Sequence, residues 1–390
     1  MISSSVSKYF CPTQIIMGVG ARFALQDILK QESARKILLM VDGALLESRF
    51  FSDIKDIVTQ AGASFYIFSD IEPEPSAETV HRAFEVQQSC GATLTIAVGG
   101  GSTMDAAKAV GILATSGGRI NDYEGIEKFS SPPLPLIALP STAGTGSEVS
   151  GSCVISNTQE HRKMSIRHAS LNPARYAILD PDALATAPAH VIAHAGIDAF
   201  VHAFESYISR QANIFTDAVN LHAIELIHGN IRQLAADPTN KQAGLAMLCG
   251  SALAGMAFGQ TGLGNVHCMA RFVGAGFHLS HGLSNAICLP YVAQFNMQAT
   301  PVKFARAARA MGQDTQGLTQ WEAARKAVAL IREMCDDLGI PPNLAAAGVD
   351  QGSLAQMADA CSRAGYEKWN PRRTSRQDFQ TLFERAYAGA

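Results

Sequence analysis

The chain is organised around the stretch TLTIAVGGGSTMDAAKAVGIL, residues 93–113. Its first six residues, Thr93–Val98, predict a buried strand. A run of three glycines and a serine follows, and from Met104 to Leu113 the apolar residues recur at helical spacing. A strand that enters a helix through a glycine-rich turn is a basic unit of parallel α/β sheets, so this stretch predicts such a sheet.

The same alternation of strands and helices extends to both sides of this stretch. The predicted strands are Lys36–Val41, Ser64–Phe68, Leu134–Leu139 and Tyr176–Leu179, and the predicted helices between the first of them are Phe51–Ala61 and Thr79–Cys90. Because strands and helices alternate, we expect a doubly wound, mostly parallel sheet with helices on both faces.

The composition of the chain changes near Pro181. From Ala189 to the C-terminus the chain is rich in alanine, and its apolar residues keep helical spacing. At 390 residues the chain is too long for one ordinary core. We therefore predict an α/β domain over residues 1–185 and an all-helical domain over residues 186–390.

Composition excludes several classes of protein. The hydrophobic content of 47% and charged content of 17% are typical of a soluble globular chain, and a net charge of −3 argues against a nucleic-acid partner. We find no uninterrupted apolar run of about 20 residues for a membrane and no secretory signal in MISSSVSKYF. The eight cysteines form no Cys-x-x-Cys pair, which favours reduced thiols in the cytoplasm and excludes the usual cysteine zinc site.

The glycine turn can hold a phosphate. Gly99, Gly100 and Gly101 allow a ligand to approach the backbone, and the helix that follows presents unpaired N–H groups. Ser102 and Asp105 have the spacing of a capping box, which would set the start of that helix, and we include both in the predicted cofactor site. On its own, such a turn fits a plain tight turn about as well as a nucleotide site.

A second polar loop, PSTAGTGSE, follows the next predicted strand at Pro140–Glu148. Loops at the carboxyl ends of neighbouring parallel strands form the crevice in which such sheets bind ligands, so the two loops together favour a nucleotide. Asp42, at the end of another predicted strand, is placed to accept a ribose 2′-hydroxyl, which favours NAD over NADP. Alternatively, Asp42-Gly43 is only a turn.

Candidate metal ligands lie in the second half of the chain. Asp198 and His202 are four residues apart on the predicted helix Ile192–Ser206, so both side chains lie on one face. His267 and His281 lie in NVHCMARFVGAGFHLSHG, where glycines allow the chain to bend. One carboxylate and three imidazoles suit Fe(II), Zn(II), Mn(II) or Co(II).

Spacing alone leaves the membership of this site open. His194 lies one turn before Asp198 on the same face, and His278 lies three residues before His281, so either is a rival ligand. An Asp-x3-His pair on a helix is also often a surface ion pair.

Four motifs and a shorter segment resemble the iron-containing (group III) alcohol dehydrogenase family, which includes lactaldehyde reductases, 1,3-propanediol dehydrogenases and ethanolamine-utilisation alcohol dehydrogenases. The motifs are GGGSTMDAAKA (Gly99–Ala109), LPSTAGTGSEV (Leu139–Val149), GIDAFVHAFESY (Gly196–Tyr207) and GLGNVHCMARFVGAGFHLSHGLSNAICLP (Gly262–Pro290), and the shorter segment is NPRRTS (Asn370–Ser375). Their order matches the family, and the similarity covers essentially the whole chain.

The resemblance implies a dinucleotide-binding N-terminal domain, a helical C-terminal domain, an active site between them, and a dimer or larger homo-oligomer. Residue by residue, it implies one divalent metal, with Fe(II) preferred, held by Asp198, His202, His267 and His281. For the cofactor NAD it implies contacts from the Gly99–Ser102 loop, from Ser141, Thr142 and Thr145, and from Lys163 and Leu179.

One position departs from the family pattern. Most relatives have a second histidine four residues after the ligand at 267, with a role in proton transfer, whereas this chain has Arg271. A guanidinium stays charged and cannot replace that histidine as an acid or base. Arg271 is either a structural substitution paired with a carboxylate or a clamp for an anionic substrate group.

The resemblance therefore predicts Lewis-acid-assisted hydride transfer between NAD(H) and a small alcohol or aldehyde. If Arg271 is a clamp, the aldehyde carries a carboxylate, sulfonate or phosphonate, as sulfoacetaldehyde does. With the usual histidine absent, the proton would move through water, the ribose hydroxyl or His278. The alternatives are a general short-chain alcohol dehydrogenase, a relative of maleylacetate reductase, a lyase on the same architecture, or a non-catalytic nucleotide-binding regulator.

Overall fold

The structure is a computed structural model that describes residues 6–390. The chain folds into two compact units. An α/β unit comprises residues 10–187 and 239–252, and a helical unit comprises residues 188–238 and 253–390 together with the segment that ends at Tyr9. The division at residue 185 in the sequence analysis stays a prediction of where the domains separate.

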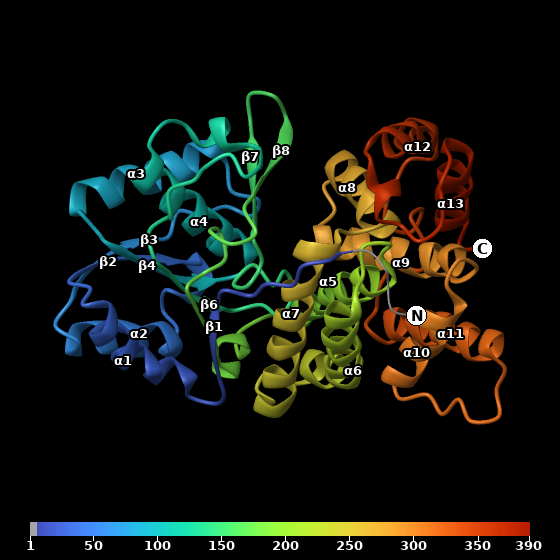
Figure 1. Cartoon of the computed structure of the whole chain (residues 1–390), viewed down its shortest axis with the longest axis horizontal. Helices are drawn as coiled ribbons and strands as arrows, with labels where there is room; N and C mark the ends of the chain where they lie inside the picture. The colour runs from blue at the N-terminus through green and yellow to red at the C-terminus, as the bar shows by residue number, and fades with distance from the viewer. Residues whose placement is uncertain (1–5) are drawn as a thin grey trace. The chain divides into compact units, whose positions relative to one another are not determined.

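A six-stranded parallel sheet forms the centre of the α/β unit (Figure 1). Its strand order is β1-β9-β6-β4-β2-β3, and each neighbouring pair is parallel. The strands are β1 (Gln14–Met17), β2 (Lys36–Val41), β3 (Ser64–Phe68), β4 (Leu94–Gly99), β6 (Leu136–Pro140) and β9 (Tyr176–Leu179). The predicted α/β class is confirmed.

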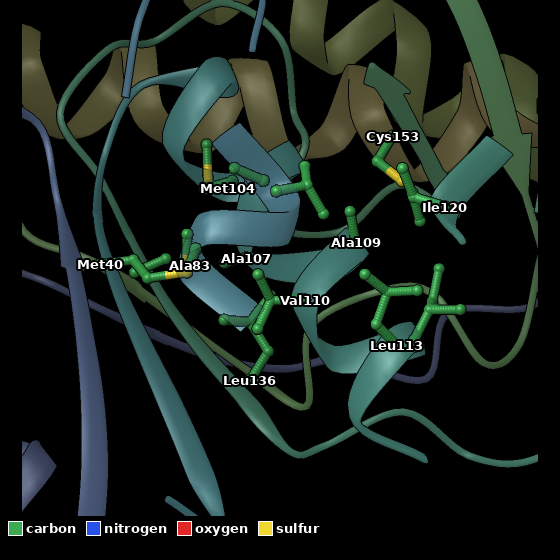
Figure 2. Packing of buried hydrophobic residues seen from close by; sticks show 14 of the residues in the cluster. Met40, Ala83, Met104, Ala107, Ala109, Val110, Leu113, Ile120, Leu136 and Cys153 are labelled. Carbon is green, nitrogen blue, oxygen red and sulfur yellow. The ribbon is translucent and has the colours of Figure 1, made fainter. Parts of the chain in front are cut away.

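Helices cover both faces of this sheet, because its central strands are apolar on both sides. The helices are α1 (Leu25–Glu32), α2 (Arg49–Gln60), α3 (Ala77–Cys90) and α4 (Gly101–Ser116). In β2, Ile37 and Leu39 pack with the cluster that includes α1 and α2, whereas Met40 packs with the cluster of α3 and α4. Figure 2 shows this second cluster, in which Met104 and Val110 of α4 are buried.

The structure contains a small second sheet that the sequence analysis did not predict. Its three strands are β5 (Gly125–Ile126), β7 (Ser152–Asn157) and β8 (Arg162–Arg167), where β7 and β8 form an antiparallel hairpin. Their burial alternates along the strand, since only one face is covered. Such short, half-polar strands carry no continuous apolar run.

The predicted capping box is wrong. Helix α4 begins at Gly101, with Gly100 as its N-cap and no side-chain cap. The Ser102 hydroxyl instead accepts a hydrogen bond from the Glu74 backbone N–H at 3.2 Å, and Asp105 accepts one from the Ser147 hydroxyl at 2.6 Å. The glycine turn lets the helix start earlier than its side chains indicate.

From Ala189 onward, every regular element in the described chain is a helix, which confirms the predicted helical half. The α-helices are α5 (Ala189–Ile208), α6 (Ile214–Ala236), α7 (Lys241–Thr261), α8 (Asn265–Phe277), α9 (His281–Met297), α10 (Pro301–Ala310), α11 (Gln320–Asp337), α12 (Leu354–Arg363) and α13 (Arg376–Ala388). Within the helical unit, α5 packs against α6 and α9, and α8 packs against α9 and α12.

Helix α7 is the one helix of the described chain that is long and apolar enough to cross a membrane. In its most apolar window, 56% of the residues are buried inside the protein. This burial is typical of a core helix, and the helix is weak evidence for a membrane span.

Candidate functional site

Helix α5 carries two of the predicted metal ligands, Asp198 and His202, one turn apart. Both side chains are buried, and the His202 Nδ1 lies 3.8 Å from the Asp198 Oδ2. The His202 ring stacks on Phe258, with ring centroids 4.4 Å apart. This packing fixes the imidazole orientation on the buried face of the helix.

Two further helices supply the remaining imidazoles. His267 lies in the first turn of α8 and is buried, and its Nε2 is 3.8 Å from the Asp198 Oδ1. His281 is the first residue of α9, directly after the N-cap Ser280. Its Nε2 is 3.6 Å from the same Asp198 oxygen, but its side chain is 43% exposed. The donor set is therefore open to solvent on the His281 side.

These four side chains form a donor set that fits a divalent metal ion. One ligand atom from each lies within 4.8 Å of the others. Four ligands at the usual metal distance of about 2.1 Å stand roughly 3.4 Å apart in a tetrahedron. The 3.6 and 3.8 Å separations above are close to that value. The set predicted from the family resemblance is thus assembled in the structure.

Two of the ligands are in the protonation states that bind a metal. Burial would raise the pKa of Asp198, but the neighbouring imidazoles and a hydrogen bond from Asn285 outweigh it, and the pKa is lowered. Burial, together with the neighbouring imidazoles, holds the pKa of His267 well below its usual value. The pair is therefore an ionised carboxylate and a neutral imidazole at neutral pH.

Asn285 is a buried neighbour of the donor set that the sequence analysis missed. It lies one turn after His281 on α9, and its Nδ2 donates to the Asp198 Oδ1 at 2.7 Å. The same nitrogen lies 3.1 Å from the His281 Nε2 and 3.4 Å from the His267 Nε2. The i, i+4 spacing from His281 could have revealed it.

Glu205 is a second missed residue. It lies on α5 three residues after His202, and its Oε2 is 2.8 Å from the His267 Nδ1. Burial raises the pKa of its carboxyl to about 7, although backbone N–H groups of Val266, His267 and Gly264 favour the charged form. Its spacing from Asp198 and His202 on one helix, at seven and three residues, was the available sequence pattern.

The rival ligands lie outside the donor set. His194 has its Nδ1 3.4 Å from the Ser280 hydroxyl and is in ring contact with His190. His278 is an exposed residue at the C-cap of α8, with a φ of 53°. Arg271 is also exposed, one turn after His267 on α8. Among the described residues, no carboxylate forms an ion pair with Arg271, and its guanidinium carbon lies 5.9 Å from the Phe272 ring centroid.

In the α/β unit, the two predicted loops begin side by side. Strands β4 and β6 are paired so that Gly99 lies opposite Pro140, and the Ser141 N–H donates to the Gly99 carbonyl at 2.9 Å. A Cβ atom placed on Gly101 would lie 2.6 Å from the Thr145 Cγ2, and one on Gly99 would lie 2.4 Å from the Thr103 Oγ1. A ligand can therefore approach the backbone of this glycine turn only because these residues are glycines.

Asp42 lies at the end of β2, the strand beside β4, and its N–H donates to the Val98 carbonyl at 2.9 Å. One carboxylate oxygen accepts the Ala44 N–H at 3.0 Å, so Asp42 does form a turn. The turn interpretation is therefore confirmed, and the role of Asp42 toward a ribose 2′-hydroxyl stays a prediction.

The structure places three other predicted cofactor residues within contacts of the protein itself. Asp105 accepts hydrogen bonds from the Ser147 hydroxyl and from the Val154 N–H, so its carboxylate is engaged within the protein. Lys163, on β8, pairs with Glu74 at 2.6 Å. Leu179 is buried at the end of β9. Their roles toward NAD stay predictions.

Comparison with known proteins identifies the family. The model of the iron-containing alcohol dehydrogenases matches residues 12–181, and the C-terminal model of the Fe-containing alcohol dehydrogenase family matches residues 192–387. The 1,3-propanediol dehydrogenase of Klebsiella pneumoniae is 36% identical over 388 residues, which cover 99% of this chain and 100% of the relative.

Solved structures agree with this. The crystal structure of 1,3-propanediol oxidoreductase matches with a TM-score of 0.95 at 36% identity and covers 98% of this chain and 100% of the other. The sulfoacetaldehyde reductase of Bifidobacterium kashiwanohense, solved in complex with NAD+, matches with a TM-score of 0.89 at 25% identity. That match covers 98% of this chain and 99% of the other. Because the matches extend through both units, the chain belongs to the iron-containing alcohol dehydrogenase family.

Proposed function

We propose that this protein transfers a hydride between NAD(H) and a small aldehyde or alcohol that carries an anionic group, and that Arg271 binds that group. When bound, a divalent ion supplies Lewis acidity toward the substrate oxygen, and NAD supplies the hydride acceptor. Asp198, His202, His267 and His281 would hold the ion, and the Gly99–Ser102 and Ser141–Thr145 loops would hold the dinucleotide.

The exposure of the four ligands indicates where substrate approaches the metal centre. Asp198, His202 and His267 are buried, whereas His281 is 43% exposed. A small substrate would therefore reach the donor set from the His281 side.

The free guanidinium of Arg271 is the single observation that carries the substrate proposal. A structural substitution would place Arg271 beside a carboxylate, yet within the described chain it forms no ion pair, while its side chain is exposed. It lies four residues after the ligand His267 on α8, on the same face of the helix. An arginine fork there suits a carboxylate, sulfonate or phosphonate.

A relative with an anionic substrate supports this proposal. The protein from Bifidobacterium kashiwanohense is named a sulfoacetaldehyde reductase, and its structure contains NAD+. A protein of the same fold is thus named for a sulfonated aldehyde, and its structure holds NAD+.

The proposal is tested by the substrate preference of two arginine variants. Metal-reconstituted enzyme is assayed with NADH against sulfoacetaldehyde and succinic semialdehyde, and against the neutral propionaldehyde. We expect Arg271→His to lower the ratio of anionic to neutral kcat/KM by about 10- to 100-fold, as for loss of a charged hydrogen bond. Arg325→His, which changes an exposed arginine on α11, is the control and should leave the ratio unchanged.

The opposite outcome is equally clear. If Arg271→His leaves that ratio unchanged, Arg271 does not bind the substrate, and a general short-chain alcohol dehydrogenase is the better description. Failure of both classes of aldehyde to oxidise NADH would instead contradict the hydride-transfer proposal itself.

We also propose a cytoplasmic homo-oligomer. All eight cysteines are free thiols, which suits a reducing compartment. Light scattering of the purified protein would give the mass, and a monomer of 41.4 kDa would contradict the oligomer.

A further inference from the structure

Glu205 is a buried acidic residue that neither the ligand set nor the substrate proposal accounts for. It is 2% exposed and lies in the last turn of α5, where burial makes an unpaired carboxylate costly. Four hydrogen bonds to its two oxygens offset that cost.

All four partners belong to the start of helix α8. Oε2 accepts from the Gly264 N–H at 3.0 Å and from the His267 N–H at 3.3 Å, and Oε1 accepts from the Val266 N–H at 2.7 Å. A Cβ on Gly264 would lie only 2.9 Å from Oε1. Glu205 therefore satisfies the N–H groups that the first turn of a helix leaves unpaired, and its charge suits that end of the helix.

The fourth hydrogen bond reaches a metal ligand. The Glu205 Oε2 lies 2.8 Å from the His267 Nδ1. The three backbone N–H groups favour the ionised form of Glu205, and that carboxylate accepts a hydrogen bond from the Nδ1–H group. The neutral imidazole then has its proton on Nδ1 and its lone pair on Nε2. Nε2 is the atom that faces the Asp198 Oδ1 at 3.8 Å. Glu205 thus selects the tautomer of His267 that can bind a metal.

We propose that Glu205 is the positioning residue of the metal centre. It joins α5, which carries Asp198 and His202, to the first turn of α8 and holds the His267 ring with Nε2 directed at the other donor atoms. Outer-sphere carboxylates of this kind raise the basicity of the imidazole and restrict its rotation.

Zinc affinity tests the proposal without any assay of activity. Zn(II) binding to the metal-free protein is measured by competition with a chromophoric chelator, for the wild type and for Glu205→Gln. The amide has nearly the same shape, but it replaces one acceptor oxygen with a donor. We expect the Kd for Zn(II) to rise by about 10- to 100-fold.

A matched control separates this role from helix capping. The Asn370 side-chain oxygen accepts from the Asn265 N–H at 3.2 Å, in the same turn of α8, and from the Asn296 amide at 2.9 Å. Asn370→Ser therefore loosens the same turn without touching His267. It should lower the Tm of the metal-free protein and leave the Kd for Zn(II) within about twofold. Equal losses of zinc affinity in the two variants, or no loss in Glu205→Gln, would overturn the proposal.

A second measurement uses the wild-type protein and does not depend on whether Glu205→Gln folds. In Zn(II)-loaded protein with 15N-labelled histidine, long-range 1H–15N correlations distinguish the tautomers, and His267→Gln identifies the His267 resonances. We expect His267 to carry its proton on Nδ1. A proton on Nε2 would overturn the proposal. Because no substrate enters either measurement, its failure is distinguishable from failure of the proposed function.

Discussion

His278 ends helix α8 in a left-handed conformation, with a φ of 53°. This conformation is strained for most residues, although histidine and asparagine tolerate it better than others. The exposed imidazole lies three residues before His281, which is the exposed ligand of the donor set. Position and chemistry together make it our candidate for moving a proton to or from the substrate oxygen, since Arg271 cannot do so.

We predict that His278→Asn lowers kcat by about 10-fold or more and changes the pH dependence of kcat, because general acid–base catalysis by a side chain contributes 10²-fold or more and water replaces it poorly. Asparagine keeps the backbone conformation, so the change tests the imidazole alone. His190→Asn, which alters an exposed histidine on α5, is the control. An unchanged kcat and pH profile in fully metal-loaded His278→Asn would remove His278 from the mechanism.

The metal ligands show how far single residues can be predicted from sequence. Asp198 and His202 share a helix face, so their spacing was informative. His267 and His281 lie on different helices, and spacing could not exclude His194 or His278, because an exclusion needs the packing of α5 against α8 and α9. The family resemblance made the choice that the structure confirms.

At the scale of elements, the β4–α4 turn depends on small residues. Gly101 faces the loop after β6, where its missing side chain leaves room for Thr145. We predict that Gly101→Ala weakens NADH binding by about 10-fold or more, because the added methyl group would lie 2.6 Å from the Thr145 Cγ2 and would push the two loops apart.

Fluorescence titration with NADH checks this prediction. Gly229→Ala on α6 is the matched control, because nothing lies within 4 Å of its added Cβ and alanine favours a helix. If Gly101→Ala binds NADH as tightly as the control does, the two loops do not form the dinucleotide site.

The second loop contains a buried acid that makes stability depend on pH. Burial raises the pKa of Glu148 to about 7 from its usual 4.5, against weaker effects of a backbone hydrogen bond and Lys108. The folded protein therefore holds this proton at pH values where the unfolded chain has lost it. The stabilisation is complete below about pH 4.5 and is lost as the pH rises through about 7.

We predict that the Tm of the wild type falls between pH 5 and pH 8 relative to that of Glu148→Gln, which has no such proton to lose. The difference corresponds to roughly 3 kcal/mol at most. Calorimetry of both proteins across this range checks it, and other titrating groups cancel in the comparison. Parallel pH dependences of the two Tm values would contradict it.

Elements differ in how well their sequences predict them, for a physical reason. Strands β2, β3 and β9 match the predicted residues, because each is a short run of mainly apolar side chains. Such runs are typical of the strands in a parallel sheet that helices cover on both faces. The β7–β8 hairpin was missed because its strands are short and polar residues interrupt their apolar ones. The start of α4 was misplaced because Ser102 and Asp105 make tertiary hydrogen bonds in place of a cap.

At the scale of the whole molecule, the chain divides its chemistry between two units. All four metal ligands belong to the helical unit, and the Gly99–Ser102 and Ser141–Thr145 loops belong to the α/β unit. Each ligand should therefore stabilise mainly the elements that it contacts, since binding free energy adds to the stability of the bound state. The family match is consistent with this division, because one model ends at residue 181 and the other begins at residue 192.

We predict that hydrogen exchange separates the two ligands along the chain. Zn(II) should protect peptides from α5 and from the first turns of α8 and α9, because it joins three helices that otherwise open locally. NADH should protect the Gly99–Asp105 and Ser141–Thr145 peptides, because these two loops would contact the proposed diphosphate. Mass spectrometry of the metal-free protein with Zn(II), NADH or both gives the pattern of protection.

Two outcomes would contradict the prediction. If NADH binds and leaves both loops unprotected, the dinucleotide site lies elsewhere. If Zn(II) leaves α8 unprotected, His267 is not a metal ligand in solution.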